Sequence, residues 1–295
     1  MSPDRSRRVG GYALIAGAAT SWGMWPLILR RAPMDASLQS VIVMSILTLA
    51  SLPLCLRDRV PARAPRAAWL GIAWLGVADA MNIALFFAAY QRTSVAIAVL
   101  THYLTPVLVA LAAPWALGER MTARTWGATL TSLAGLVLLL RPWSAGLSRG
   151  DLVGAALGAG SAVFYASNVI VTKKLSRAFS GSEQMFFHGL VAVPLLWLLV
   201  PSGALASAPR ASLVVIALAA LGPGALGGLT FVWGLRRVPA GHASVLTLLE
   251  PLVAVLLAAV WLGEIPPVVS VFGGAAVLAG AVVVVTGRTT SSAPA

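Results

Sequence analysis

The sequence predicts an all-α integral membrane protein with ten transmembrane helices, arranged as two inverted five-helix repeats. Three observations lead to this fold class: an apolar composition, a regular succession of apolar blocks, and a repeat of the first half in the second. Hydrophobic residues make up 59% of the 295 residues, charged residues only 10%, and the mean hydropathy is +0.88. Soluble domains carry about 25% charged residues, so this composition favours a chain that lies largely in lipid.

The apolar residues occur in blocks about as long as the roughly 20 residues that a helix needs to cross the hydrocarbon of a bilayer. Pro, Gly and Arg mark the short connections between them. Runs of this length and uniformity do not fit the alternating strands of a membrane β-barrel. The predicted spans are 9–29, 36–56, 67–90, 94–117, 122–140, 151–172, 183–200, 211–235, 240–262 and 266–286.

The net charge of +12 is distributed in the way that orients a membrane protein, not in a stripe that binds nucleic acid. With the N-terminus inside, the connections on the cytoplasmic side hold 15 Lys and Arg residues and those on the opposite side hold 6. The positive-inside rule therefore predicts both termini in the cytoplasm. The expected partners are the lipid bilayer and a small-molecule substrate, with no nucleic acid, and a monomer is the expectation.

The second half of the chain repeats the first. The stretch 92–119 aligns with 237–264 at a constant offset of 145, including the tripeptide Leu-Gly-Glu that ends each stretch. Because five spans is an odd number, the second repeat enters the membrane in the opposite orientation, a design that recurs in transporters with a site at the repeat interface. We therefore assign residues 1–145 to the first repeat and residues 146–295 to the second.

The repeated residues also carry a family resemblance. The motifs are Thr93-Ser-Val-Ala, Tyr103-Leu-Thr-Pro and Leu117-Gly-Glu, echoed by Leu249-Glu-Pro and Leu262-Gly-Glu. Together they resemble the EamA-type domain of the drug/metabolite transporter superfamily, over nearly the whole chain, and the chain looks most similar to the bacterial aromatic amino-acid exporters. The resemblance implies a ten-helix exporter of amino acids, metabolites or toxic compounds in the bacterial inner membrane.

Other function classes find little support. The chain has no His-Glu-x-x-His, no Gly-x-Ser-x-Gly and no phosphate loop ending in Gly-Lys-Ser/Thr, so neither an enzyme nor an ATP-driven pump is expected. With Cys55 as the one cysteine and three histidines on separate spans, no disulfide, metal site or cofactor is expected. The open alternatives are a multidrug exporter of organic cations, and less readily a channel or a non-transporting scaffold.

Several candidate substrate-binding residues lie in the first half. Hydrocarbon penalises an ionisable group by about 2.5–3.5 kcal/mol at a helix centre. The presence of Asp79 in the middle of the third block therefore calls for a functional or structural explanation. Asn82 and Phe86 follow at helical spacing and share its face. This face predicts a substrate path in which Asp79 attracts an ammonium group or carries a proton; the alternative is a polar clasp to a neighbouring helix. His102 and Tyr103 are further candidates, although a lone buried histidine is more often a satisfied hydrogen-bond partner.

The second half contributes a matching set. Tyr165 and Asn168 form a polar stripe on the sixth span, and at an offset of 143 Tyr165 corresponds to Trp22, a weaker candidate because it lies toward a span end. Glu250 precedes Pro251, which deprives the helix of one hydrogen bond, and Thr247 lies close to the same face. A structural role for Glu250 and a role in the site remain equally open. His188 and His242 receive less weight as cavity residues.

Overall fold

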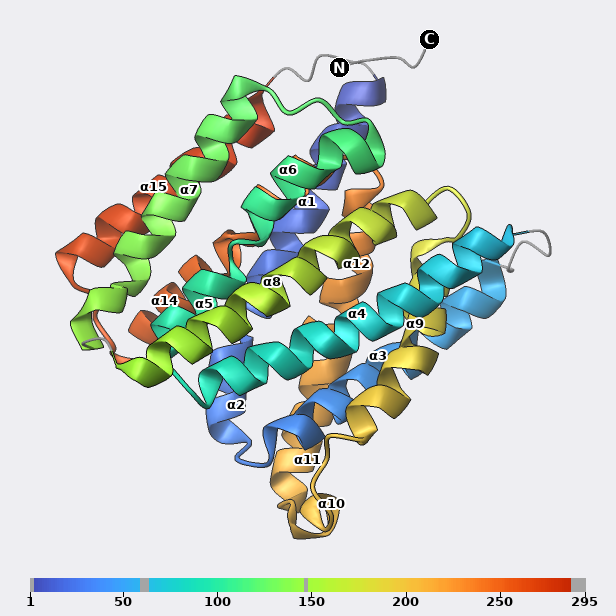
Figure 1. The fold of residues 1–295 in the computed structure, drawn as a ribbon, viewed down its shortest axis with the longest axis vertical. Coiled ribbons are helices and arrows are strands. Elements are labelled where there is room, and N and C mark those ends of the chain that lie inside the picture. Colours follow the sequence, from blue (N-terminus) through green and yellow to red (C-terminus); the bar gives the residue numbers. More distant parts are fainter. Residues whose placement is uncertain (1–2, 59–63, 146–147, 288–295) are drawn as a thin grey trace.

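The computed structural model describes residues 3–58, 64–145 and 148–287, and every regular element in these ranges is helical (Figure 1). The expected boundary between the two halves adjoins residues 146–147, which lie outside the described residues. The elements are α1 (Pro3–Trp22), α2 (Trp25–Arg31), α3 (Ala36–Asp58), α4 (Arg66–Tyr90), α5 (Val95–His102), α6 (Thr105–Leu117), α7 (Ala123–Leu140), η1 (Pro142–Ala145), α8 (Arg149–Leu175), α9 (Gly181–Trp197), α10 (Ala204–Ser207), α11 (Arg210–Ala219), the π-helix η2 (Ala220–Leu226), α12 (Gly227–Leu235), α13 (Ala240–Thr247), α14 (Leu249–Leu262) and α15 (Val268–Thr286).

Nine helical segments in the described part of the chain are long and apolar enough to cross a membrane. They correspond to nine of the ten predicted spans. The seventh predicted span, 183–200, coincides with α9, which has 17 residues. Its last residues, 198–200, continue as tighter turns with hydrogen bonds from Leu199 to Leu196 and from Val200 to Trp197. The all-helical membrane fold is confirmed, whereas the tenth span stays a prediction.

Three predicted spans are each broken into two helices at a proline. The breaks separate α1 from α2, α5 from α6, and α13 from α14. In each case Pro26, Pro106 or Pro251 lies within the first three residues of the following helix. Proline has no amide hydrogen and clashes with the preceding turn, so the upstream helix cannot continue through it. A fourth span is continuous but passes through η2, which contains Pro223.

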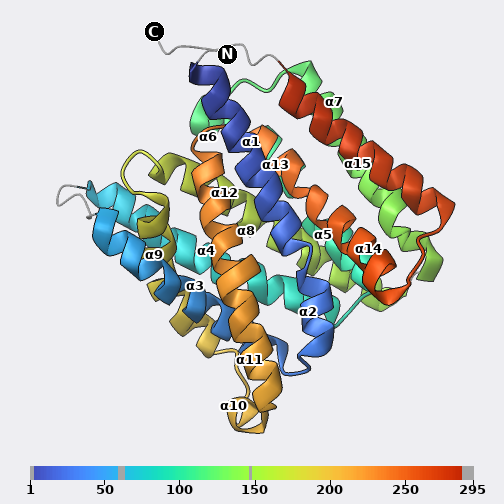
Figure 2. The same ribbon diagram turned by 180° about the vertical axis from the view of Figure 1, so that it is seen from behind.

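Five helix pairs make the most extensive contacts: α7 with α15, α4 with α8, α3 with α9, α1 with α12, and α4 with α9. Each pair joins a helix before residue 146 to a helix after it. Figures 1 and 2 show α7 and α15 side by side along one flank of the molecule. Their close approach requires glycine, because a Cβ at Gly135 would lie 2.7 Å from the carbonyl oxygen of Gly273.

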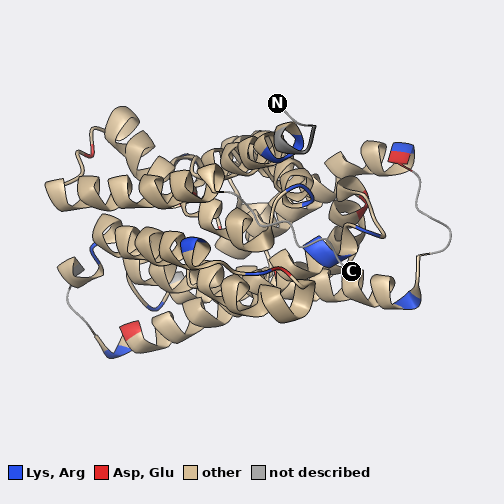
Figure 3. Ribbon diagram, turned by 90° about the horizontal axis from the view of Figure 1, so that it is seen from above, with Lys and Arg blue, Asp and Glu red and all other residues tan. Residues whose placement is uncertain are grey.

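Charged residues avoid the middle of the helices. Figure 3 shows long stretches of ribbon without a charged side chain, and most Lys, Arg, Asp and Glu residues lie near helix ends and connections. The largest cluster of buried apolar residues joins α1, α8, α12 and α13, and Trp22 and Tyr165 pack against its edge. Asp79 and Glu250 are therefore acidic groups in otherwise apolar helices, α4 and α14.

Candidate functional site

Phe86, His102 and Tyr165 form an aromatic stack where α4, α5 and α8 meet. The ring of His102 lies nearly parallel to that of Tyr165, with 5.2 Å between centroids and 9° between planes. Its centroid is 4.3 Å from that of Phe86. Tyr103 joins the group edge-on, 5.4 Å from His102. The stack offers flat ring faces of the kind on which an aromatic ligand packs.

The break between α5 and α6 positions this stack. α5 ends at His102 because Pro106 cannot extend it, and α6 begins at Thr105. His102 Nδ1 lies 2.7 Å from Ser161 Oγ of α8. The Ser161 hydroxyl donates to the carbonyl oxygen of Gly158 at 2.9 Å. Since that hydroxyl hydrogen is already used, His102 Nδ1 carries the hydrogen of the neutral ring, and its Nε2 keeps the lone pair.

Glu250 lies at the corresponding break of the second half, in the first turn of α14. The Tyr103 hydroxyl donates a hydrogen bond to the Glu250 carboxylate. The charges of Glu250 and Asp79 both act on the Tyr165 hydroxyl. Two carboxylates thus lie within electrostatic reach of the aromatic stack. The group draws on α4 and α5 before residue 146 and on α8 and α14 after it.

Asp79 connects α4 to two other helices. Its Oδ1 accepts a hydrogen bond of 3.1 Å from Asn168 Nδ2 of α8. Its Oδ2 lies 3.4 Å from His188 Nε2 of α9. The polar clasp that was the alternative to a substrate path therefore has clear partners, and both are in the second half. His188, to which the sequence gives less weight than to His102, also belongs to this group, because the packing of α9 on α4 brings it to Asp79.

Two amide oxygens beside this group have no partner. Oδ1 of Asn82 and Oδ1 of Asn168 are buried and accept no hydrogen bond. A buried acceptor left unsatisfied costs about 1–3 kcal/mol, so each such group in a native structure calls for an explanation, such as a bound ligand, ion or water. An ammonium or hydroxyl group of a ligand would supply the missing donors.

Two predicted residues lie apart from the stack. Thr247 is 1% exposed, and its hydroxyl donates to the carbonyl oxygen of Ser244 within α13. Trp22, at the end of α1, packs on Phe231 of α12 with 5.3 Å between ring centroids. Helical spacing places a residue on a face of its own helix, but which neighbour that face meets is decided by tertiary packing.

His242 has a structural environment. Its Nδ1 lies 2.7 Å from the Tyr12 hydroxyl of α1, and its Nε2 lies 3.2 Å from the Thr125 hydroxyl of α7. The rings of Tyr12 and His242 stack, with 5.9 Å between their centroids. Both ring nitrogens are thus occupied by protein groups, and His242 fastens α13 to α1 and α7.

A second charged group closes one end of the molecule. Glu119, just after α6, lies 3.7 Å from Lys173 Nζ of α8 and accepts a 2.7 Å hydrogen bond from the amide of Ala240. Burial raises the pKa of the Glu119 carboxyl above its ordinary value, while the charge of Lys173 opposes the shift. Lys173 Nζ also donates to the carbonyl oxygens of Leu235 and Val238. Glu119 is therefore a loop contact and not a member of the aromatic group.

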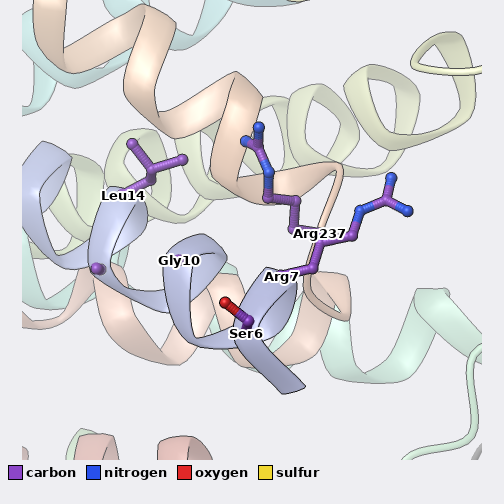
Figure 4. A pocket seen from close by; sticks show the side chains of 6 residues that line it. Ser6, Arg7, Gly10, Leu14 and Arg237 are labelled. Carbon is purple, nitrogen blue, oxygen red and sulfur yellow. The ribbon is translucent and has the colours of Figure 1, made fainter. Parts of the chain in front are cut away.

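A groove of about 460 Å³ lies elsewhere, beside the beginning of α1 (Figure 4). Figure 4 shows Arg7 of α1 and Arg237 of the α12–α13 connection at its rim. Arg237 also donates to the carbonyl oxygen of Trp233 at 2.6 Å. None of the predicted substrate-binding residues lines this groove.

The model of the EamA-like transporter family matches the chain twice, at residues 9–141 and 152–286. The chain belongs to this family. The resemblance read from the repeated motifs is thereby confirmed, and the protein is a multi-pass membrane transporter. The two matched ranges fall on either side of the predicted boundary between the halves.

Three relatives of this EamA-family chain are informative. An uncharacterized transporter of Archaeoglobus fulgidus is 30% identical over 274 residues, which cover 92% of this chain and 95% of that protein. A probable terminal-alkyne amino-acid exporter of Streptantibioticus cattleyicolor is 27% identical, with 92% of each chain covered. A pseudopaline exporter of Pseudomonas aeruginosa is 29% identical over 126 residues, 41% of this chain and 43% of that protein.

One solved crystal structure superposes with a TM-score of 0.79 at 21% identity, covering 95% of this chain and 98% of the other. At that identity the likeness concerns the fold alone. The fold is thus shared along essentially the whole chain.

Proposed function

We propose that this protein is a secondary exporter of small amphipathic metabolites, with aromatic or other neutral amino acids as the first candidates. The substrate would bind at the interface of two inverted repeats and cross by alternating access. The observation that carries the proposal is the aromatic stack of Phe86, His102 and Tyr165 beside the carboxylates of Asp79 and Glu250. An amino acid with an aromatic side chain has the ring and the ammonium group that such a place accommodates.

The inverted-repeat architecture is supported by three features. The family model matches each half separately. The breaks before Pro106 and Pro251 also occur at corresponding positions, 145 residues apart. In addition, the beginning of α1 and the end of α15 lie at the same end of the molecule (Figures 1 and 2), as an even number of spans requires. We place both of these ends on the cytoplasmic side of a bacterial inner membrane.

An exporter of organic cations is the second candidate. It is favoured by the charges around the stack, since the predicted substrate-binding residues include Asp79 and Glu250 but no Lys or Arg. A cation would gain from both carboxylates. An amino acid would have to place its own carboxylate near the same negative charges. The side-chain amide of Asn82 can donate a hydrogen bond to that carboxylate.

Counterflow in proteoliposomes tests the proposal. Vesicles loaded with unlabelled phenylalanine should accumulate radiolabelled phenylalanine transiently, and external tryptophan and tyrosine should compete. Competition by tetraphenylphosphonium alone would favour the cation exporter. If neither amino acids nor organic cations show counterflow, the proposed site is wrong, even though the family assignment stands.

A further inference from the structure

The hydrogen positions of His188 follow from its surroundings. Its Nδ1 lies 2.7 Å from the backbone carbonyl oxygen of Gln184. A carbonyl oxygen can only accept, so Nδ1 must carry a hydrogen and donate it. In the neutral ring the remaining nitrogen, Nε2, then has a lone pair, and this is the nitrogen that lies 3.4 Å from Asp79 Oδ2.

A neutral His188 and an ionised Asp79 would therefore turn two acceptors toward each other. One added proton removes this conflict, since it can reside on the carboxyl group and bond to Nε2, or on Nε2 and bond to the carboxylate. The other oxygen, Oδ1, already accepts from Asn168 Nδ2 and does not compete for the proton. His188 is 5% exposed, so water does not substitute freely for that proton.

We propose that Asp79 and His188 together bind one exchangeable proton and that this proton is the coupling ion of export. The inference rests on the proposed function and gives it an energy source. The pair has a net charge of −1 when empty and 0 when loaded. Entry of one proton into the cell, bound by this pair during the crossing, would accompany the exit of one substrate molecule held at the aromatic stack.

The surroundings of Asp79 contain few other titratable groups. On α8, the hydroxyl of Tyr165 interacts electrostatically with Asp79 and also with Glu250 of α14. From α9 the facing group is His188. Two further helices pack on α4. On α5 the titratable side chain is His102, which is bonded to Ser161, and on α3 the titratable side chains lie near the end that carries Asp58.

His188→Gln separates proton coupling from substrate binding, because it leaves Asp79 and the aromatic stack in place. The side-chain amide of glutamine can donate to ionised Asp79, so the pair no longer needs a proton to keep two acceptors apart. Wild-type vesicles with the membrane potential clamped at zero should concentrate labelled phenylalanine about tenfold per unit of pH gradient, if one proton exchanges for one substrate. H188Q should keep counterflow but lose this accumulation. Asp35→Asn, which alters the exposed cap of α3, should behave like wild type.

Loss of counterflow together with accumulation in H188Q would overturn the inference, because His188 would then be needed for substrate binding itself. Retained pH-driven accumulation would overturn it as well.

Proton binding is also measurable without transport. In a potentiometric titration of detergent-solubilised protein over roughly pH 5 to 8, D79N and His188→Gln should each bind about one proton fewer than wild type. Identical titration of all three proteins would refute the proton site whatever the protein carries. A missing proton in the variants combined with absent flux in wild type would instead refute the proposed substrates alone.

Discussion

The two halves of the molecule follow the same path but place different chemistry along it. Asp79 of α4, in the first half, contacts Asn168 of α8, in the second half. At the offset of 145, the residue corresponding to Asp79 is Gly224 of η2, and Asn168 corresponds to Trp25 at the offset of 143. A Cβ at Gly224 would lie 3.5 Å from the Trp25 ring. The polar contact of Asp79 with Asn168 thus corresponds to a contact between the Trp25 indole and Gly224.

The same exchange occurs one turn further along. Asn82 corresponds to Gly227, where a Cβ would lie 2.7 Å from Trp22 Nε1, and Trp22 is the counterpart of Tyr165. The helix breaks differ in the opposite sense, because Thr105 follows the first break and the acidic Glu250 follows the second. A duplicated scaffold therefore does not imply a duplicated site. The buried polar group of α4 belongs to one half only.

The largest expected effect concerns the opposite orientation of the two halves, because a single cysteine at each end should be labelled from one side of the membrane only. On a Cys55→Ser background, Ser6→Cys at the start of α1 should react with a membrane-impermeant maleimide only from the cytoplasmic side. Ser144→Cys in η1, after five spans, should react only from the outside. Labelling of both cysteines from one side would break the proposed topology.

The next largest effect concerns stability, to which the glutamates of the two Leu-Gly-Glu tripeptides should contribute differently. Glu119 contacts Lys173 and Ala240, whereas Glu264 is exposed. Glu119→Ala removes an acceptor from both partners, and we expect a loss of about 1–3 kcal/mol in the free energy of unfolding. Glu264→Ala should cost clearly less. Denaturant unfolding in detergent measures both, and equal losses would show that the two ends are equivalent.

A methyl group at Gly227 should have a somewhat smaller effect. Gly227→Ala places a Cβ 2.7 Å from Trp22 Nε1, and such overpacking costs about 1–2 kcal/mol. Gly222→Ala in the neighbouring η2 is the matched control, because no atom lies within 4 Å of its Cβ position. A lower thermal midpoint for G227A alone is the expected result; equal midpoints would mean that Trp22 has room to move.

The smallest effect concerns the ring pair Tyr165 and Trp22. Removal of a stacked ring costs about 0.5–1.5 kcal/mol, so Tyr165→Ala should lower the counterflow of aromatic amino acids by about two- to tenfold. Trp22→Ala should lower it less, because Trp22 packs on Phe231. Comparable amounts of folded protein in the membrane are the control. Greater loss in W22A would move the substrate toward the contact of Trp22 with Phe231, between α1 and α12.

The sequence predicts the helices well because apolar length is a property of each segment alone. The prolines coincide with the breaks, but the sequence predicts 94–117 and 240–262 each as one continuous span, and only the loss of a hydrogen bond at Pro251 is expected from it. The site is predicted in part: the spacing of Asp79, Asn82 and Phe86 marks one face, and His102 and Tyr165 meet it. His188 and Thr247 show where this reasoning ends. Whether a buried polar residue meets another helix or its own backbone depends on how helices distant in the sequence pack, which no single segment encodes.

The ammonium group of Lys173 has three hydrogens and faces three acceptors, the carbonyl oxygens of Leu235 and Val238 and the carboxylate of Glu119. At this end of the protein, the three hydrogens of Lys173 are thus matched by protein acceptors instead of water. To separate α8 from the α12–α13 connection, incoming water must replace the carbonyl oxygens of Leu235 and Val238. For a carrier that opens at this end, each cycle would take up water, and its turnover would fall as osmolytes lower the activity of water.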